Sequence, residues 1–194
     1  MQNLEPYYNW LEYYSSEADA LSPFHGKEYS EFEFSNTIYN YYIHPQWDDF
    51  ESSTLYLKVL FADYDDGFVI IELIGEWNDC LHNDIMLLKR NVIDVFIKNK
   101  INKFILIGEN VLNFHTDDDC YYEEWFDEID DGWIALLNFR DFVEHEIKSA
   151  HLDQYMLMGF PVNDINWRKY TPDSLFSFID EMTTKRLQPP SRNI

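Results

Sequence analysis

The chain has 194 residues, of which 46% are hydrophobic and 18% aromatic, enough apolar material for one packed domain with an extension. Disorder of the whole chain is excluded, because it requires low hydrophobicity together with high charge. The formal net charge of −22, from 14 Lys and Arg against 36 Asp and Glu, argues against binding to nucleic acid or to an anionic membrane. The same charge is compatible with basic protein partners, divalent cations or solubility alone.

The sequence is typical of a cytoplasmic protein. Its two cysteines, Cys80 and Cys120, are too few for a secreted disulfide framework, and we expect both to be free thiols in the core. The start, MQNLEPYYNW, lacks the basic and apolar regions of a signal peptide. No apolar window is long enough to span a membrane.

Residues 1–50 form an acidic extension that is rich in Tyr, Trp and Phe, with Lys27 as its single Lys or Arg. Within it, EYSEFEF and TIYNYYIH alternate well enough to predict short strands. Because so many aromatic side chains are unfavourable in water, we expect the extension to pack on the main domain or on a second subunit, and we predict a homo-oligomer, a dimer. Residues 44–53, HPQWDDFESS, have the composition of a linker.

From residue 54 onward, apolar strands alternate with amphipathic helices. Two β-rich runs are separated by Asp65, Asp66 and Gly67, which is a strong hairpin signal. Thr171 is suited to the N-cap of the last helix and Pro172 to its first helical position. The expected elements are strands at 53–64, 67–75, 102–108, 133–139 and 155–159, and helices at 78–100, 116–131, 140–152 and 170–186.

This order predicts the fold class. Strands that alternate with helices require right-handed crossovers and a mainly parallel sheet, while the initial hairpin adds an antiparallel edge. We therefore expect an α/β domain with a mixed, mainly parallel sheet over residues 51–188, after the extension at 1–50. Residues 189–194 are expected to be a flexible tail.

Three segments resemble the STAS domain of anti-sigma-factor antagonists, which is also found at the cytoplasmic end of sulphate transporters. IIELIGEWND resembles the family's strand ending in Gly-Glu-Leu-Asp, KFILIGENVLNFHTDDD resembles its strand followed by Asp-Ser-Ser-Gly, and GWIALLNFRDFVEHEIKSAHLDQYMLMG resembles its next strand, helix and short strand. The resemblance covers about residues 54–160. It implies a STAS-like fold and a regulatory role through protein–protein contact.

The family's phosphorylated serine is missing from this chain. Its place, at the start of the second helix, is taken by Thr116, Asp117, Asp118 and Asp119. The resemblance therefore implies a member that has lost the phosphorylation switch or carries fixed negative charge there. One aspartate imitates a phosphoserine poorly, because it has about one charge against roughly −1.5 to −2.

The segment HTDDD has three interpretations. His115, Asp117 and Asp118 could bind Mg²⁺, Mn²⁺ or Ca²⁺, because hard cations prefer oxygen ligands. Alternatively, Thr116 or Asp117 caps a helix with an acidic first turn, and this is the interpretation we favour. A protein contact is the third.

The helix that follows is acidic and aromatic at once. No Lys or Arg occurs between Phe104 and Phe139, whereas residues 117–131 hold nine Asp and Glu. Such a surface suits a basic, partly apolar protein partner, although the aromatic side chains could instead face the core. The candidate partner-binding residues are Thr116, Asp117, Asp118, Asp119, Tyr121, Tyr122, Glu123 and Glu124.

No catalytic residue and no cofactor is assigned. Cys80 and His82 lie close in sequence, but a thiolate is disfavoured among acidic neighbours, and we expect Cys80 to be buried. Glycine-rich phosphate loops and zinc-protease motifs are absent. We expect a non-catalytic interaction module, and the alternatives are an acidic inhibitor or immunity-type protein and a divalent-metal-dependent enzyme that uses HTDDD.

Overall fold

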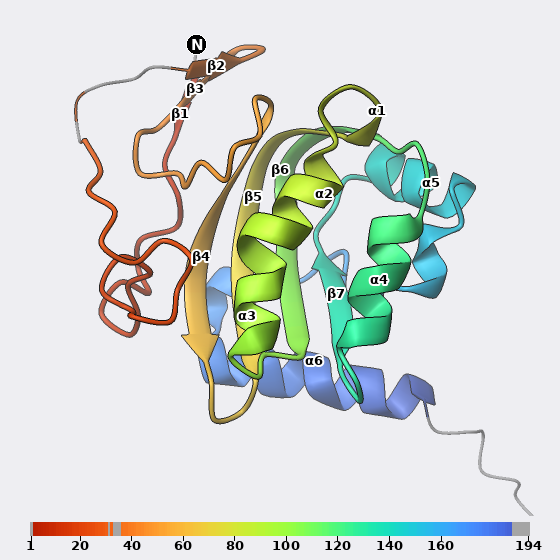
Figure 1. The fold of residues 1–194 in the computed structure, drawn as a ribbon. Coiled ribbons are helices and arrows are strands. Elements are labelled where there is room, and N and C mark those ends of the chain that lie inside the picture. Colours follow the sequence, from red (N-terminus) through yellow and green to blue (C-terminus); the bar gives the residue numbers. More distant parts are fainter. Residues whose placement is uncertain (1, 31, 33–35, 188–194) are drawn as a thin grey trace, which may run out of the picture.

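The computed structural model describes residues 2–30, 32 and 36–187, which form an α/β fold around a four-stranded mixed sheet (Figure 1). The strands follow one another across the sheet in the order β4-β5-β6-β7. β4 is antiparallel to β5, and the pairs β5–β6 and β6–β7 are parallel. The mixed, mainly parallel sheet is therefore confirmed. Its strands are β4 (Leu55–Asp63), β5 (Phe68–Asn78), β6 (Lys103–His115) and β7 (Trp133–Leu137).

The predicted hairpin joins β4 to β5. The carboxylate of Asp63 accepts hydrogen bonds from the backbone N–H groups of Asp65 and Asp66, at 2.8 and 2.9 Å. Gly67 has a φ of 71°, a conformation that glycine adopts without steric cost. The acidic turn is thus built by its own side chains.

The predicted helix at 78–100 is interrupted. A short α1 ends before Asn83, whose φ of 54° is left-handed, and a second helix then begins. Leu81 consequently lies outside the core and is 77% exposed, although it stands at helical spacing from the buried Ile85 and Leu88. The second helix contains a π-turn, and the segments are α1 (Asp79–His82), α2 (Asp84–Leu88), η1 (Lys89–Ile93) and α3 (Asp94–Lys98).

Helices cover both faces of the sheet (Figure 1). The continuous helix from α2 to α3 packs on one face together with α4 (Cys120–Glu128) and α5 (Asp141–Ser149), as right-handed crossovers between neighbouring parallel strands require. The opposite face is covered by α6 (Pro172–Leu187). The N-cap role of Thr171 is confirmed, since its hydroxyl accepts from the N–H of Ser174 at 3.4 Å. The short 3-10 helix η2 (Leu152–Gln154) belongs to the first of these faces and the short 3-10 helix η3 (Trp167–Lys169) to the second.

Three strand predictions differ clearly from the structure, and one of them is the strand predicted at 67–75, which continues to Asn78 as β5. The strand predicted at 102–108 continues to His115, because β6 stays paired with β5 beyond the end of its pairing with β7. The last strand, predicted at 155–159, is reduced to a single bridge between Leu157 and Ala135. Leu157 nevertheless pairs with the outer edge of β7, accepting from Leu136 N at 2.9 Å and donating to Ile134 O at 2.7 Å.

The N-terminal extension packs on its own domain, at the β4 edge of the sheet (Figure 1). Trp10 and Phe24 are 3% and 2% exposed and belong to the two cores that flank the sheet. TIYNYYIH does form strands, whereas EYSEFEF forms none over 28–30 and otherwise falls largely outside the described residues. The extension contains a three-stranded sheet in the order β1-β3-β2, made of β1 (Gln2–Leu4), β2 (Asn36–Ile38) and β3 (Tyr41–Ile43).

The prediction of a linker at 44–53 is wrong. Trp47, Asp48 and Phe50 are buried, and the backbone of Asp48 pairs with that of Leu57 on the outer edge of β4. The polar residues of this segment suggested an exposed linker, but Asp48 is buried beside Lys58. The distance between its Oδ2 and the Lys58 Nζ is 3.6 Å. The predicted flexible tail at 189–194 lies outside the described residues.

Replacing Gly132 by alanine should destabilise the fold strongly. A Cβ there would lie 1.9 Å from the carbonyl oxygen of Asn102 and 2.7 Å from that of Ile129, and backbone cannot move aside cheaply. We expect Gly132→Ala to lower the free energy of unfolding by about 3 kcal/mol or more in urea denaturation. Gly26→Ala is the control, since nothing lies within 4 Å of its added Cβ and only its φ of 72° costs about 1–2 kcal/mol. Equal losses in both variants would contradict the steric explanation.

Candidate functional site

Helix α4 carries the acidic segment, and its inward side is apolar. Tyr122, Trp125 and Ile129 are buried against the sheet. The hydroxyl of Tyr122 donates to Asp79 Oδ2 at 2.6 Å, and burial raises the pKa of Asp79 to about 6. Tyr122 is therefore an anchor of the helix, and the prediction that it contacts a partner is wrong.

A second side of α4 faces the helix from α2 to α3. The guanidinium of Arg90 binds both carboxylate oxygens of Glu124, at 2.5 and 2.8 Å. The buried Lys89 ammonium lies 2.6 Å from Glu128 Oε2 and also contacts Asp94. Glu124 is thus paired within the chain, which corrects its assignment to a free partner-binding surface.

The start of α4 differs from the prediction. Neither Thr116 nor Asp117 caps the helix, which begins at Cys120 with Asp119 in the N-cap position and no side-chain capping hydrogen bond. Asp118 Oδ1 instead accepts from the backbone N–H of Cys120 at 3.0 Å, and the Thr116 hydroxyl donates to the Asp118 carbonyl at 3.2 Å. Because β6 continues to His115, the loop has to turn before the helix can begin.

The outward side of α4 carries carboxylates at intervals of four residues, which places them on one face of a helix. We call this surface the acidic stripe. It also includes the three aspartates that precede the helix and the two in the turn after it. None of its members forms an ion pair within the part of the chain that the structure describes. The acidic stripe consists of the exposed residues Asp117, Asp118, Asp119, Glu123, Asp127, Asp130 and Asp131.

The candidate metal ligands are not gathered into a binding site. His115 Nε2 lies 2.9 Å from the amide nitrogen of Asn113. Across residues 2–30, 32 and 36–187, no group of three His, Cys, Asp or Glu side chains is placed so that it could hold a metal ion. His115, Asp117 and Asp118 are therefore neighbours in sequence that the structure does not bring together as ligands.

Both cysteines are exposed, which contradicts the prediction that they are buried in the core. The Cys80 thiol donates to the Thr116 carbonyl at 3.2 Å, and the Cys120 thiol donates to Asp118 Oδ1 at 2.7 Å. The bond to Asp118 raises the pKa of Cys120, because it stabilises the neutral thiol. An acidic neighbour of this kind does not favour a nucleophilic thiolate.

A groove of about 560 Å³ lies next to the acidic stripe, and we call it the α4 groove. It runs between the C-terminal half of α4, the turn before β7, the segment around Tyr155 and the side of α6 at Thr183. Sequence reasoning missed it, because its walls come from four separated segments. Its lining consists of Phe126, Asp127, Ile129, Asp130, Asp131, Gly132, Trp133, Ile134, Gln154, Tyr155, Met156, Leu157 and Thr183.

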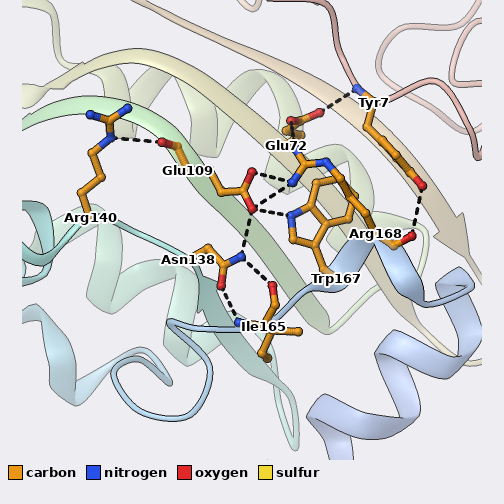
Figure 2. Close-up of polar contacts among 8 residues, drawn as sticks. All are labelled: Tyr7, Glu72, Glu109, Asn138, Arg140, Ile165, Trp167 and Arg168. Carbon is orange, nitrogen blue, oxygen red and sulfur yellow. Dashed lines mark hydrogen bonds and ion pairs between the residues drawn. The ribbon is translucent and has the colours of Figure 1, made fainter.

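A second polar cluster, also missed from sequence, lies on the opposite face of the sheet (Figure 2). Glu109, on β6, binds Arg168 at 2.7 Å and accepts from the Trp167 indole at 2.8 Å and from the Asn138 amide at 2.9 Å. These partners come from two segments, the residue that follows β7 and the 3-10 helix η3. The cluster therefore fixes the chain after β7 to the sheet, and its polar groups are already used internally.

Glu72 on β5 belongs to this cluster and is 2% exposed (Figure 2). Its carboxylate accepts from the backbone N–H of Tyr7 at 2.9 Å, and Arg168 lies 3.9 Å away. Lys58 is its cross-strand partner on β4. Burial raises the pKa of Glu72 to about 7. The sequence signal for these two buried residues was a single charged residue within an apolar strand, Lys58 in one and Glu72 in the next.

Glu72→Gln should flatten the pH dependence of stability. Between the ordinary pKa of 4.5 and the folded value of about 7, the folded wild type holds a proton that the unfolded chain has released, so its free energy of unfolding falls as pH rises. Glutamine removes this loss. We expect the variant to gain up to about 3 kcal/mol over the wild type between pH 4.5 and 7.5, measured by urea denaturation. The exposed control Glu28→Gln should follow the wild-type curve, and parallel curves for Glu72→Gln would contradict the prediction.

Within the described residues, no helix combines the length and the hydrophobicity needed to cross a bilayer. No protein-family model matches the chain, and no curated protein matches it either. What the protein binds must therefore be inferred from the acidic stripe and its surroundings.

Proposed function

We propose that the protein is a non-catalytic interaction module with a STAS-like core, which binds a protein partner with a basic surface through the acidic stripe. The observation that carries this proposal is the contrast between two sides of α4. Glu124 and Glu128 are paired with Lys89 and Arg90, whereas the acidic stripe has no cation of its own among the described residues. Uncompensated carboxylates repel one another, and a basic partner would relieve that repulsion.

The strand order supports the STAS-like part of the proposal. A hairpin comes first, the strands then follow in sequence order, and the helices from α2 to α5 lie on one face over the range of the resemblance. The acidic stripe begins at Asp117, in the loop that corresponds to the family's phosphorylated segment. Fixed carboxylates at this place favour a permanent negative contact surface over a switched one.

The proposal includes self-association of the chain through its N-terminal extension. Tyr8, Leu11 and Tyr13 lie close in sequence and are 62%, 52% and 53% exposed. They flank Trp10, which anchors the extension to the sheet. Large apolar side chains gathered on one exposed segment are typical of a protein contact.

The triple variant Tyr8→Ser, Leu11→Ser and Tyr13→Ser should be monomeric. In sedimentation velocity we expect the wild type to have twice the chain mass of 23.4 kDa and the variant to have that mass once. Leu81→Ser is the control, since Leu81 is 77% exposed but lies on α1, and it should leave the dimer intact. A monomeric wild type at tens of micromolar would refute self-association. It would leave the proposal that the acidic stripe binds a basic partner unaffected.

Charge reversal should abolish partner binding. The test is a pull-down from a lysate of the native organism, at low and at high salt, with identification by mass spectrometry. We expect one stoichiometric partner that is lost at high salt and lost in the variant Asp117→Lys, Asp118→Lys, Glu123→Lys and Asp127→Lys. Glu124 is left unchanged because its pairing with Arg90 supports the fold.

The control has the same change in net charge on other exposed surfaces. It is the variant Glu12→Lys, Glu28→Lys, Glu146→Lys and Asp173→Lys, which should keep the partner. Capture of the same partner by the stripe variant would contradict the proposal. A nuclease or toxin as the partner would identify the inhibitor alternative, and a chelator-reversible melting shift with Mg²⁺ or Mn²⁺ and no partner would favour the metal-dependent enzyme.

A further inference from the structure

We propose that the α4 groove receives an apolar side chain of the partner, so that the partner's contact segment has an aromatic or aliphatic residue flanked by lysines or arginines. This inference rests on the proposed function and names the chemistry of the segment that the acidic stripe would recognise. It concerns a site of a different physical kind, because the stripe supplies charge and the groove supplies apolar contact.

The floor of the groove is apolar, and its size suits a side chain. Ile129 and Ile134, which are 2% and 1% exposed, line it together with Met156 and Leu157. A volume of about 560 Å³ falls in the range of about 300–1,000 Å³ that binding pockets occupy. One large side chain, or two smaller ones, could enter without opening the core.

Phe126 forms the lip of the groove on the α4 side. Its side chain is 42% exposed, whereas that of its neighbour Trp125 on the same helix is fully buried. Its ring packs at an angle against that of Tyr155, which also lines the groove, with 5.8 Å between the two ring centres. Two aromatic rings that face one cavity offer a large contact area at low entropic cost, as is typical of anchor sites in protein interfaces.

The rim of the groove has charge of one sign. Asp127, Asp130 and Asp131 line it, and all three also belong to the acidic stripe. No Lys, Arg or His is among the residues that line the groove. An acidic segment would be repelled at this rim, and a purely apolar one would leave the carboxylates without partners. Charge complementarity therefore selects a segment that is apolar at its centre and basic on both sides.

Binding of defined peptides to the full-length protein tests the inference. The probe is the fluorescein-labelled peptide Lys-Lys-Phe-Leu-Lys-Lys, and its controls replace Phe-Leu by Ser-Ser or every Lys by Glu. We expect the first peptide to bind at least about tenfold more tightly than either control in fluorescence anisotropy. In NMR of ¹⁵N-labelled protein, it should shift the indole N–H signal of Trp133, which lines the groove, and leave that of Trp167 unchanged.

Two phenylalanines give a matched pair of variants. Phe126 and Phe142 are 42% and 48% exposed, and both lie on helices, but only Phe126 lines the groove. Phe126→Ser should weaken binding of the first peptide at least about fivefold, and Phe142→Ser should leave it unchanged. Circular dichroism would show that both variants keep the wild-type helix content.

The outcomes separate this inference from the proposed function. Equal affinity for the Phe-Leu and Ser-Ser peptides, equal effects of the two phenylalanine variants, or no signal shift at millimolar peptide would each overturn the groove inference. Salt-sensitive capture of the native partner would still support the proposed function in those cases. Capture that survives charge reversal of the acidic stripe would overturn the proposed function, whatever the peptides show.

Discussion

The buried ammonium of Lys89 determines which carboxylates of α4 face solvent. Its side chain is fully buried at the contact between α4 and the helix from α2 to α3, where Asp94, Glu124 and Glu128 surround it. Removing the partners of a buried charge costs about 3–5 kcal/mol, so α4 cannot rotate freely about its axis. With one pair of acids fixed against Lys89, the carboxylates a few residues away must face outward. A surface suited to a basic partner thus depends on an ion-pair network on another side of the same helix.

The apolar pattern predicted most elements of the fold because it reports burial. The apolar pattern gave wrong element boundaries where the backbone conformation or the strand pairing changes while the hydrophobicity of the residues does not. Leu81 has helical spacing, yet the left-handed Asn83 turns the chain before the main helix begins. The second half of β6 is not a continuous apolar run, because beyond Ile107 it has lost its pairing with β7 and, as a strand, is paired only with β5. Its extension to His115 was therefore invisible in the sequence.

The candidate site was predicted in part for a related reason. The density of acids in residues 117–131 identified α4 as the charged surface. Which members are free depends on partners that are distant in sequence. Asp79 binds Tyr122 from 43 residues away, and Arg90 binds Glu124 from 34 residues away. Composition cannot show such pairs, and it could not show a groove whose walls come from four segments.

Both outer strands of the sheet are occupied by other parts of the chain. Asp48 pairs with β4, and Leu157 pairs with β7. Open edge strands invite another extended chain to add itself by main-chain hydrogen bonds, which is also a common route to aggregation. Where these bridges lie, neither a partner nor a second copy of the chain can add a strand to the sheet. At these two edges, any recognition of another protein has to use side chains and therefore depends on the chemistry of its residues. Strand addition, in contrast, would accept almost any extended backbone.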